Sequence, residues 1–71
     1  MTTVQLYQNT LPVPPMLLRR TDDGSTIVDE AWLDGRWQPT KIILDYVFGN
    51  NDFVEPIDRP RAVAIAPGAL S

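Results

Sequence analysis

Side chains able to carry chemistry are few in this sequence, because it contains neither cysteine nor histidine. The usual acid–base group near neutral pH is therefore missing, as are thiolates and disulfides. Ser25 and Ser71 have no imidazole to activate them as nucleophiles. Asp45 lies in an apolar run, either on the polar side of a helix or as a buried carboxylate paired with an arginine. We expect a protein that is not an enzyme and has no catalytic residues.

Cofactor and metal sites are not indicated by the residue spacing either. The four glycines are isolated from one another and form no phosphate-binding loop. Asp22, Asp23 and Ser25 lack the spacing of a calcium-binding loop, so we interpret them as a solvated turn. The sequence thus predicts no cofactor and no bound metal.

The charge balance narrows the class of partner. Nine acidic and six basic residues give a formal net charge of −3, and the bases are scattered among the acids. Nucleic-acid-binding proteins usually carry a basic excess, so we expect no nucleic-acid partner. The apolar runs are far shorter than the roughly 20 residues of a membrane-spanning helix, and the first residues do not resemble a signal peptide. We expect a cytoplasmic protein without membrane contact.

Proline and aromatic residues are the candidates for partner binding. A Pro-Val-Pro-Pro segment has the spacing that aromatic grooves recognise in a polyproline II helix, which makes Pro12 and Pro15 candidates. Trp32 and Trp37 are candidates because tryptophan is enriched at binding hot spots. In a domain with a thin core, however, such a pair is more often the core itself, and Tyr46 and Phe48 raise the same choice.

Two Asp-Gly dipeptides predict the sheet that positions the tryptophans. Asp-Gly favours a two-residue hairpin because both residues can take positive φ. The turns would join a three-stranded antiparallel meander over residues 16–21, 26–33 and 36–38. The first turn, at Asp23-Gly24, would place Arg19 opposite Val28. The second, at Asp34-Gly35, would place Trp32 directly opposite Trp37.

Two short helices are predicted after the sheet. Thr40 can cap a helix over residues 40–48, in which apolar residues recur at i, i+4 spacing. Asp58 can cap a second helix over residues 58–66. The run that follows Thr40 is also rich in β-branched and aromatic residues, so a strand there is the alternative. That alternative would make the domain a small all-β barrel.

These elements define an α+β fold, with the sheet packed against one or two short helices. Residues 1–15 are expected to form an extended proline-rich arm, residues 16–66 a single compact domain, and residues 67–71 a flexible tail. As an alternative for the start of the arm, Val4, Leu6 and Tyr7 could let the first residues pair as an edge strand. The expected core consists of Leu17, Ile27, Ala31, Trp32, Trp37, Ile43, Leu44, Val47, Phe48, Ile57, Val63 and Ile65.

Residues 30–40, with the sequence EAWLDGRWQPT, precede a short apolar segment that ends at Gly49 and a later Glu-Pro-Ile. This stretch resembles small uncharacterised proteins of actinobacteria and their phages, in which a hairpin ending in Trp-x-Pro-Thr leads into a helix. The resemblance covers residues 26–65. It implies an α+β layout and a bacterial or phage origin, and it implies no activity and no site residues.

The sequence therefore predicts a small non-catalytic protein-interaction module that binds and modulates a larger protein. A subunit of a small homo-oligomer is the alternative, in which self-association completes the core. Dilution distinguishes the two, because a homo-oligomer loses structure by mass action whereas a heterotypic binder stays folded alone. An enzyme is the third interpretation, which a deep polar pocket around Asp45 and an arginine would favour.

Overall fold

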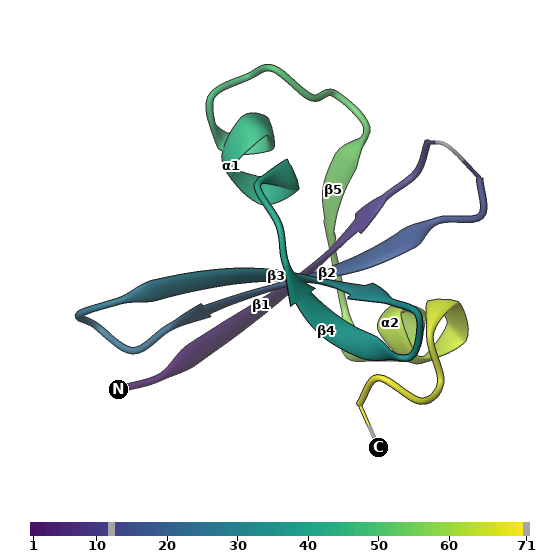
Figure 1. Cartoon of the computed structure of the whole chain (residues 1–71), viewed down its shortest axis with the longest axis horizontal. Coiled ribbons are helices and arrows are strands. Elements are labelled where there is room, and N and C mark those ends of the chain that lie inside the picture. Colours follow the sequence, from purple (N-terminus) through teal and green to yellow (C-terminus); the bar gives the residue numbers. More distant parts are fainter. Residues whose placement is uncertain (12, 71) are drawn as a thin grey trace.

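A five-stranded antiparallel sheet forms the centre of the computed structural model, which describes residues 1–11 and 13–70 (Figure 1). The strands lie in the order β4-β3-β2-β1-β5. The elements are β1 (Thr3–Asn9), β2 (Met16–Asp22), β3 (Ile27–Leu33), β4 (Arg36–Pro39), α1 (Ile42–Val47), β5 (Val54–Ile57) and α2 (Arg59–Ile65). The α+β class is confirmed and the meander is present as β2, β3 and β4. The sheet is open and has two additional strands, so the barrel alternative is wrong.

The first strand is the largest departure from the expected organisation. Thr3–Asn9, which we assigned to an extended arm, forms β1 and pairs with β2 on one side and with β5 on the other. The prolines that argued against a strand all follow Asn9, so none of them interrupts this ladder. Pro12 lies outside the described residues. The compact unit therefore includes residues that we had placed in the arm.

The β2–β3 hairpin is shifted by two residues from the predicted register. Arg19 lies opposite Glu30 rather than Val28, because the connection comprises residues 23–26 and not an Asp-Gly pair alone. The Asp23 carboxylate stabilises this longer turn by accepting two backbone N–H bonds within it, at 2.8 and 2.7 Å. A shift of two residues leaves every side chain on its own face of the sheet, so the predicted alternation survives.

The β3–β4 hairpin has the predicted geometry. Asp34 and Gly35 both take positive φ, 54° and 78°, as the two central residues of a type I′ hairpin turn do. Trp32 lies opposite Trp37, and their ring centroids are 5.4 Å apart in a T-shaped arrangement with 70° between the planes. Edge-to-face contact suits the charge distribution of aromatic rings. The local chemistry of the turn therefore brings the two indoles together.

Both faces of the sheet are covered, because Leu17 and Leu18 are consecutive in β2 and both are fully buried. Neighbouring side chains of a strand point to opposite faces. α1 packs on one face and α2, with the C-terminal residues, on the other (Figure 1). The core below α1 contains Leu18, Ala31, Ile43 and Val54. The core below α2 contains Leu17, Ala62 and Ala66.

The two helices occur where the sequence predicts them, which excludes a strand after Thr40. The N-cap of α1 is Lys41 rather than the predicted Thr40, whose hydroxyl accepts a hydrogen bond from the Ile42 backbone N–H at 3.2 Å. The Asp58 carboxylate accepts one from the Arg61 N–H at 3.1 Å. Each bond satisfies an N–H group of a first helical turn, which has no partner inside the helix.

The expected core is confirmed in part. Leu17, Ala31 and Ile43 are buried, and four further residues pack against a core while partly exposed: Trp32, Trp37, Ile57 and Ile65. The prediction is wrong for Ile27, Leu44, Val47, Phe48 and Val63, which are exposed. In helices of six and seven residues, some of the apolar side chains face away from the sheet. Ile27 is the first residue of β3, next to the β2–β3 turn. The core residues that we missed are Leu18, Val54, Ala62 and Ala66.

Candidate functional site

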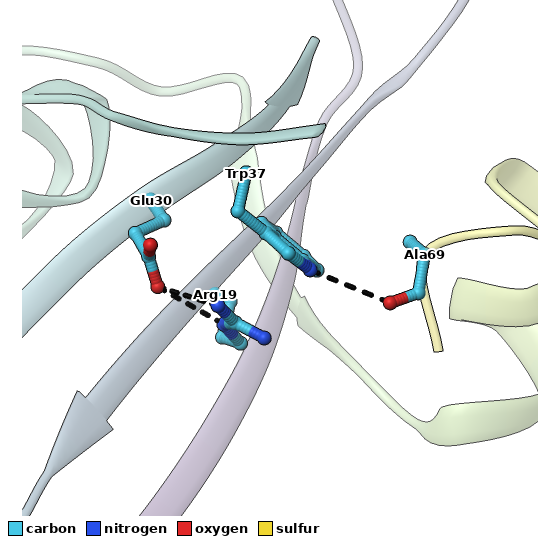
Figure 2. A network of polar contacts seen from close by, with 4 residues as sticks. All are labelled: Arg19, Glu30, Trp37 and Ala69. Carbon is cyan, nitrogen blue, oxygen red and sulfur yellow. Dashed lines mark hydrogen bonds and ion pairs between the residues drawn. The ribbon is translucent and has the colours of Figure 1, made fainter. Parts of the chain in front are cut away.

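The tryptophan pair is held in a network of internal contacts. The Arg19 guanidinium lies over the Trp37 ring, 4.0 Å from its centroid, and donates a hydrogen bond to Glu30 at 2.6 Å. Trp37 Nε1 donates to the Ala69 carbonyl oxygen at 3.4 Å (Figure 2). Trp32 packs on the same core from the neighbouring strand. Both indoles are thus already engaged by the chain's own residues.

The remaining candidates from the sequence lie elsewhere. Tyr46 packs on the opposite face of the sheet, with its ring 5.9 Å from that of Tyr7. Pro15 is partly buried beside the start of β2. The structure therefore brings the two tryptophans together and does not join Tyr46 or Pro15 to them. Ala69 and Leu70, expected to belong to a flexible tail, pack against the core below α2.

Two of the five arginines form ion pairs on the sheet, Arg19 with Glu30 and Arg20 with Asp29. Arg20 donates two hydrogen bonds to Asp29, at 2.8 and 2.9 Å, and this bonding raises the pKa of Arg20 above its ordinary value. Gln8 donates to Glu55 and accepts from Arg61 Nε at 3.2 Å. These ion pairs and hydrogen bonds connect β2 with β3 and β1 with β5 and α2.

The exposure of Asp45 decides between the two interpretations of this residue, an exposed helical acid or a buried partner of an arginine. Asp45 is exposed on α1, and it makes no ion pair within residues 1–11 and 13–70. It therefore lies on the polar side of the helix and does not form a buried ion pair with an arginine.

Within residues 1–11 and 13–70 the structure has no pocket, and no three acidic side chains lie close enough to hold a metal ion. None of the described helices has the length and apolar character needed to cross a membrane.

A group of exposed apolar side chains lies on α1 and on the loop that leads to β5. The exposed fractions are 41% for Leu44, 54% for Val47, 71% for Phe48 and 49% for Phe53. We call these four residues the α1–β5 surface. The loop and α1 lie at the same end of the molecule (Figure 1). Groups of exposed apolar residues beside polar ones are typical of interaction sites.

The short helix explains how two of these side chains come together. Leu44 and Phe48 are four residues apart, so they share one side of the helix, and Val47 is exposed at its last position. Ile43 lies on the other side and is fully buried against the sheet. Gly49 then reverses the chain with a φ of 80°, and its N–H donates to the Tyr46 carbonyl oxygen.

Phe53 is presented by a loop that is fixed to the sheet. Its carbonyl oxygen accepts from the Thr10 N–H at 2.8 Å and from the Thr10 hydroxyl at 3.0 Å. Its own N–H donates to the Asn51 side chain at 2.9 Å. Because the backbone is held on both sides, the exposed ring is positioned without any partner. The surface is therefore preformed, which lowers the entropic cost of binding.

The net negative charge of the chain arises in the sequence segment that contains this surface. Residues 41–58 contain one base, Lys41, and four acids, Asp45, Asp52, Glu55 and Asp58. The rest of the chain contains five acids and five bases, so the net charge of −3 arises from residues 41–58. Neither Asp45 nor Asp52 makes an ion pair with another described residue. Asp45 and Asp52 are thus the exposed acids that adjoin the apolar residues in sequence, whereas Glu55 accepts from Gln8 and Asp58 caps α2.

Sequence reasoning raised Phe48 as a possible contact residue but assigned it, with Leu44 and Val47, to the core, and it did not identify Phe53. The i, i+4 spacing shows that residues share a side of a helix, and it does not show which side meets the sheet. One signal could have revealed the surface. The run from Ile42 to Phe48 contains more large apolar residues than the inner side of so short a helix can bury.

Comparison of the chain with protein-family models, with curated proteins and with solved structures found no match. The class that the fold and the surface define is a small α+β domain with an apolar, acidic patch on one helix and its following loop. The function has to be argued from those residues.

Proposed function

We propose that this chain is a small non-catalytic protein-interaction module that binds a larger protein through the α1–β5 surface. The observation that supports the proposal is the exposure of Phe48 and its neighbours on a fixed helix and loop. Exposed aromatic and aliphatic side chains favour association because their burial removes apolar area from water, at about 25 cal/mol per Å². Nothing in the fold of the chain itself requires these side chains to be apolar.

Binding by addition of a strand to the sheet is less well supported. β4 and β5 are the two edge strands, and they contain Pro39 and Pro56. Proline has no N–H to donate to a new strand, and it is a common means of protecting a sheet edge. A contact through the side chains of α1 and its loop avoids this difficulty.

The tryptophans contribute to stability rather than to the contact in this proposal. Trp37 is contacted by Arg19 on one side and by Ala69 on the other. A partner that used the indoles would have to displace both contacts. Self-association through the α1–β5 surface is also disfavoured, since it would bring Asp45 and Asp52 toward the same acids of a second copy.

An affinity purification with matched variants tests the proposal. The tagged chain is incubated with an extract of its native host, and the bound proteins are quantified for wild type, Phe48→Ser and Val63→Ser. Val63 is the control, because it is an exposed apolar residue, 41% accessible, on α2. We expect Phe48→Ser to lose a specific protein that Val63→Ser retains, and the purified partner to bind the wild-type chain in titration.

Equal retention of every bound protein by the Phe48→Ser variant would contradict the proposal. Sedimentation of the purified chain tests the homo-oligomer alternative at the same time. We expect a monomer whose size does not change with concentration. A dimer that dissociates on dilution and is weakened by Phe48→Ser would favour self-assembly instead.

A further inference from the structure

We infer that the partner presents an apolar segment flanked by lysine or arginine residues to the α1–β5 surface. This inference rests on the proposed function and adds the chemistry of the partner. Its basis is that two exposed acids without an ion pair among the described residues, Asp45 and Asp52, adjoin the exposed apolar residues in sequence. Neither feature alone would define the chemistry of the partner that covers the surface.

Neither Asp45 nor Asp52 is neutralised by an ion pair among the described residues. Two of the arginines are engaged elsewhere, Arg19 with Glu30 and Arg20 with Asp29. Arg59 donates to the Leu70 carbonyl oxygen at 3.3 Å, and Arg61 donates to Gln8. Asp45 and Asp52 are exposed beside the apolar side chains. Their field extends about 8 Å at physiological ionic strength, which covers the approach of a partner.

Charge complementarity distinguishes between the possible binding partners of the surface. A second copy would oppose acids to acids, and an anionic membrane or a nucleic acid would be repelled in the same way. A neutral apolar segment could cover Phe48 and Phe53 but would leave the acids unmatched. A basic amphipathic segment satisfies both features, because its apolar side chains meet the phenyl rings while its cations lie near Asp45 and Asp52.

Two synthetic helical peptides of equal length test this inference. They share the same leucine positions, and their polar positions are all lysine in one peptide and all glutamate in the other. Each carries a fluorophore, and binding to the full chain is followed by anisotropy. We expect saturable binding of the leucine–lysine peptide and binding of the leucine–glutamate peptide that is weaker by about tenfold or more.

Variants of the chain connect that binding to the surface. Asp45→Asn and Asp52→Asn should each weaken the leucine–lysine peptide by about 1.5- to 5-fold, as expected for exposed charge pairs, and added salt should reduce the difference. Asp34→Asn, which changes an exposed acid in the β3–β4 turn, should have no effect. Phe48→Ser should weaken the same peptide.

The outcomes separate this inference from the proposed function. Equal binding of both peptides, reduced by Phe48→Ser and unaffected by the aspartate variants, would overturn the inference and leave the interaction surface in place. Binding of the leucine–lysine peptide that Phe48→Ser does not weaken would overturn the assignment of the surface itself. Tighter binding of the glutamate peptide would also overturn the inference.

Discussion

Phe48 is 71% exposed, whereas Ile43, five residues earlier and on the opposite side of α1, is completely buried. The two residues show that α1 has apolar side chains on both sides. One side packs on the sheet with Leu18 and Val54, and Leu44 is exposed to solvent together with Phe48. A helix of a solitary domain needs only the first of these sides to be apolar. The second is the side to which we assign the proposed contact.

The first prediction separates the two sides of α1 by their effect on stability. Ile43→Ala should lower the free energy of unfolding by about 2–5 kcal/mol, because it leaves a cavity in the core. Phe48→Ser should change it by less than about 0.5 kcal/mol, as exposed substitutions usually do. Urea unfolding followed by tryptophan fluorescence measures both values. A large loss of stability with Phe48→Ser would show that the ring supports the fold.

The second prediction concerns Trp32, which packs on the core below α2. Trp32→Ala should lower the free energy of unfolding by about 2–3 kcal/mol, somewhat less than for a fully buried tryptophan. Leu33→Ala is the control, because Leu33 is the next residue of β3 and is 37% exposed. Circular dichroism in urea measures both. Unchanged stability together with weaker partner binding would instead place the tryptophans in the contact surface.

The third prediction compares two adjacent polar residues that are equally buried. Gln8 and Asn9 are each 7% exposed, and Gln8 is bonded to Glu55 and Arg61. Asn9 Oδ1 is buried and has no hydrogen-bond partner among residues 1–11 and 13–70. Asn9→Leu should therefore stabilise the fold by about 1 kcal/mol, whereas Gln8→Leu should destabilise it by about 1–3 kcal/mol. Thermal unfolding decides the sign, and destabilisation by Asn9→Leu would contradict this account.

The fourth prediction is a dependence of stability on pH. Backbone N–H groups of Ser25 and Thr26 hold the pKa of Asp23 below its ordinary value of 3.8. A carboxyl whose pKa is lower in the folded chain contributes stability above its unfolded pKa and loses it as the pH falls through the folded pKa. Acidification should therefore destabilise the wild type more than Asp23→Asn below about pH 4. Melting temperatures over that range that fall in parallel would exclude this role for Asp23.

The β3–β4 hairpin could be predicted from the sequence because its geometry is decided locally. Asp34 and Gly35 both tolerate positive φ, and that turn fixes the pairing of Trp32 with Trp37. The β2–β3 hairpin contains the same dipeptide but a different turn. There the Asp23 side chain bonds to the backbone and stabilises a longer connection, which short-range patterns do not reveal.

The position of β1 and the exposure of α1 depend on contacts that are distant in sequence. Leu6 pairs with Arg19 on one side and with Ile57 on the other, and nothing in the first residues indicates those partners. Phe48 shares its periodicity with buried helical residues, so its exposure is decided by how α1 packs on the sheet. The excess of apolar residues in this segment is visible in the sequence, but which of them are exposed is decided by the tertiary packing.

The central claim is that the α1–β5 surface is the contact for a basic, apolar partner segment. Nuclear magnetic resonance of the ¹⁵N-labelled chain during addition of the leucine–lysine peptide tests it most directly. The account predicts that the amide signals that shift are those of residues 41–53, including Phe48 and Phe53, while the Trp37 indole signal stays in place. Shifts confined to Trp37 and the residues of α2, with those of α1 unchanged, would contradict it.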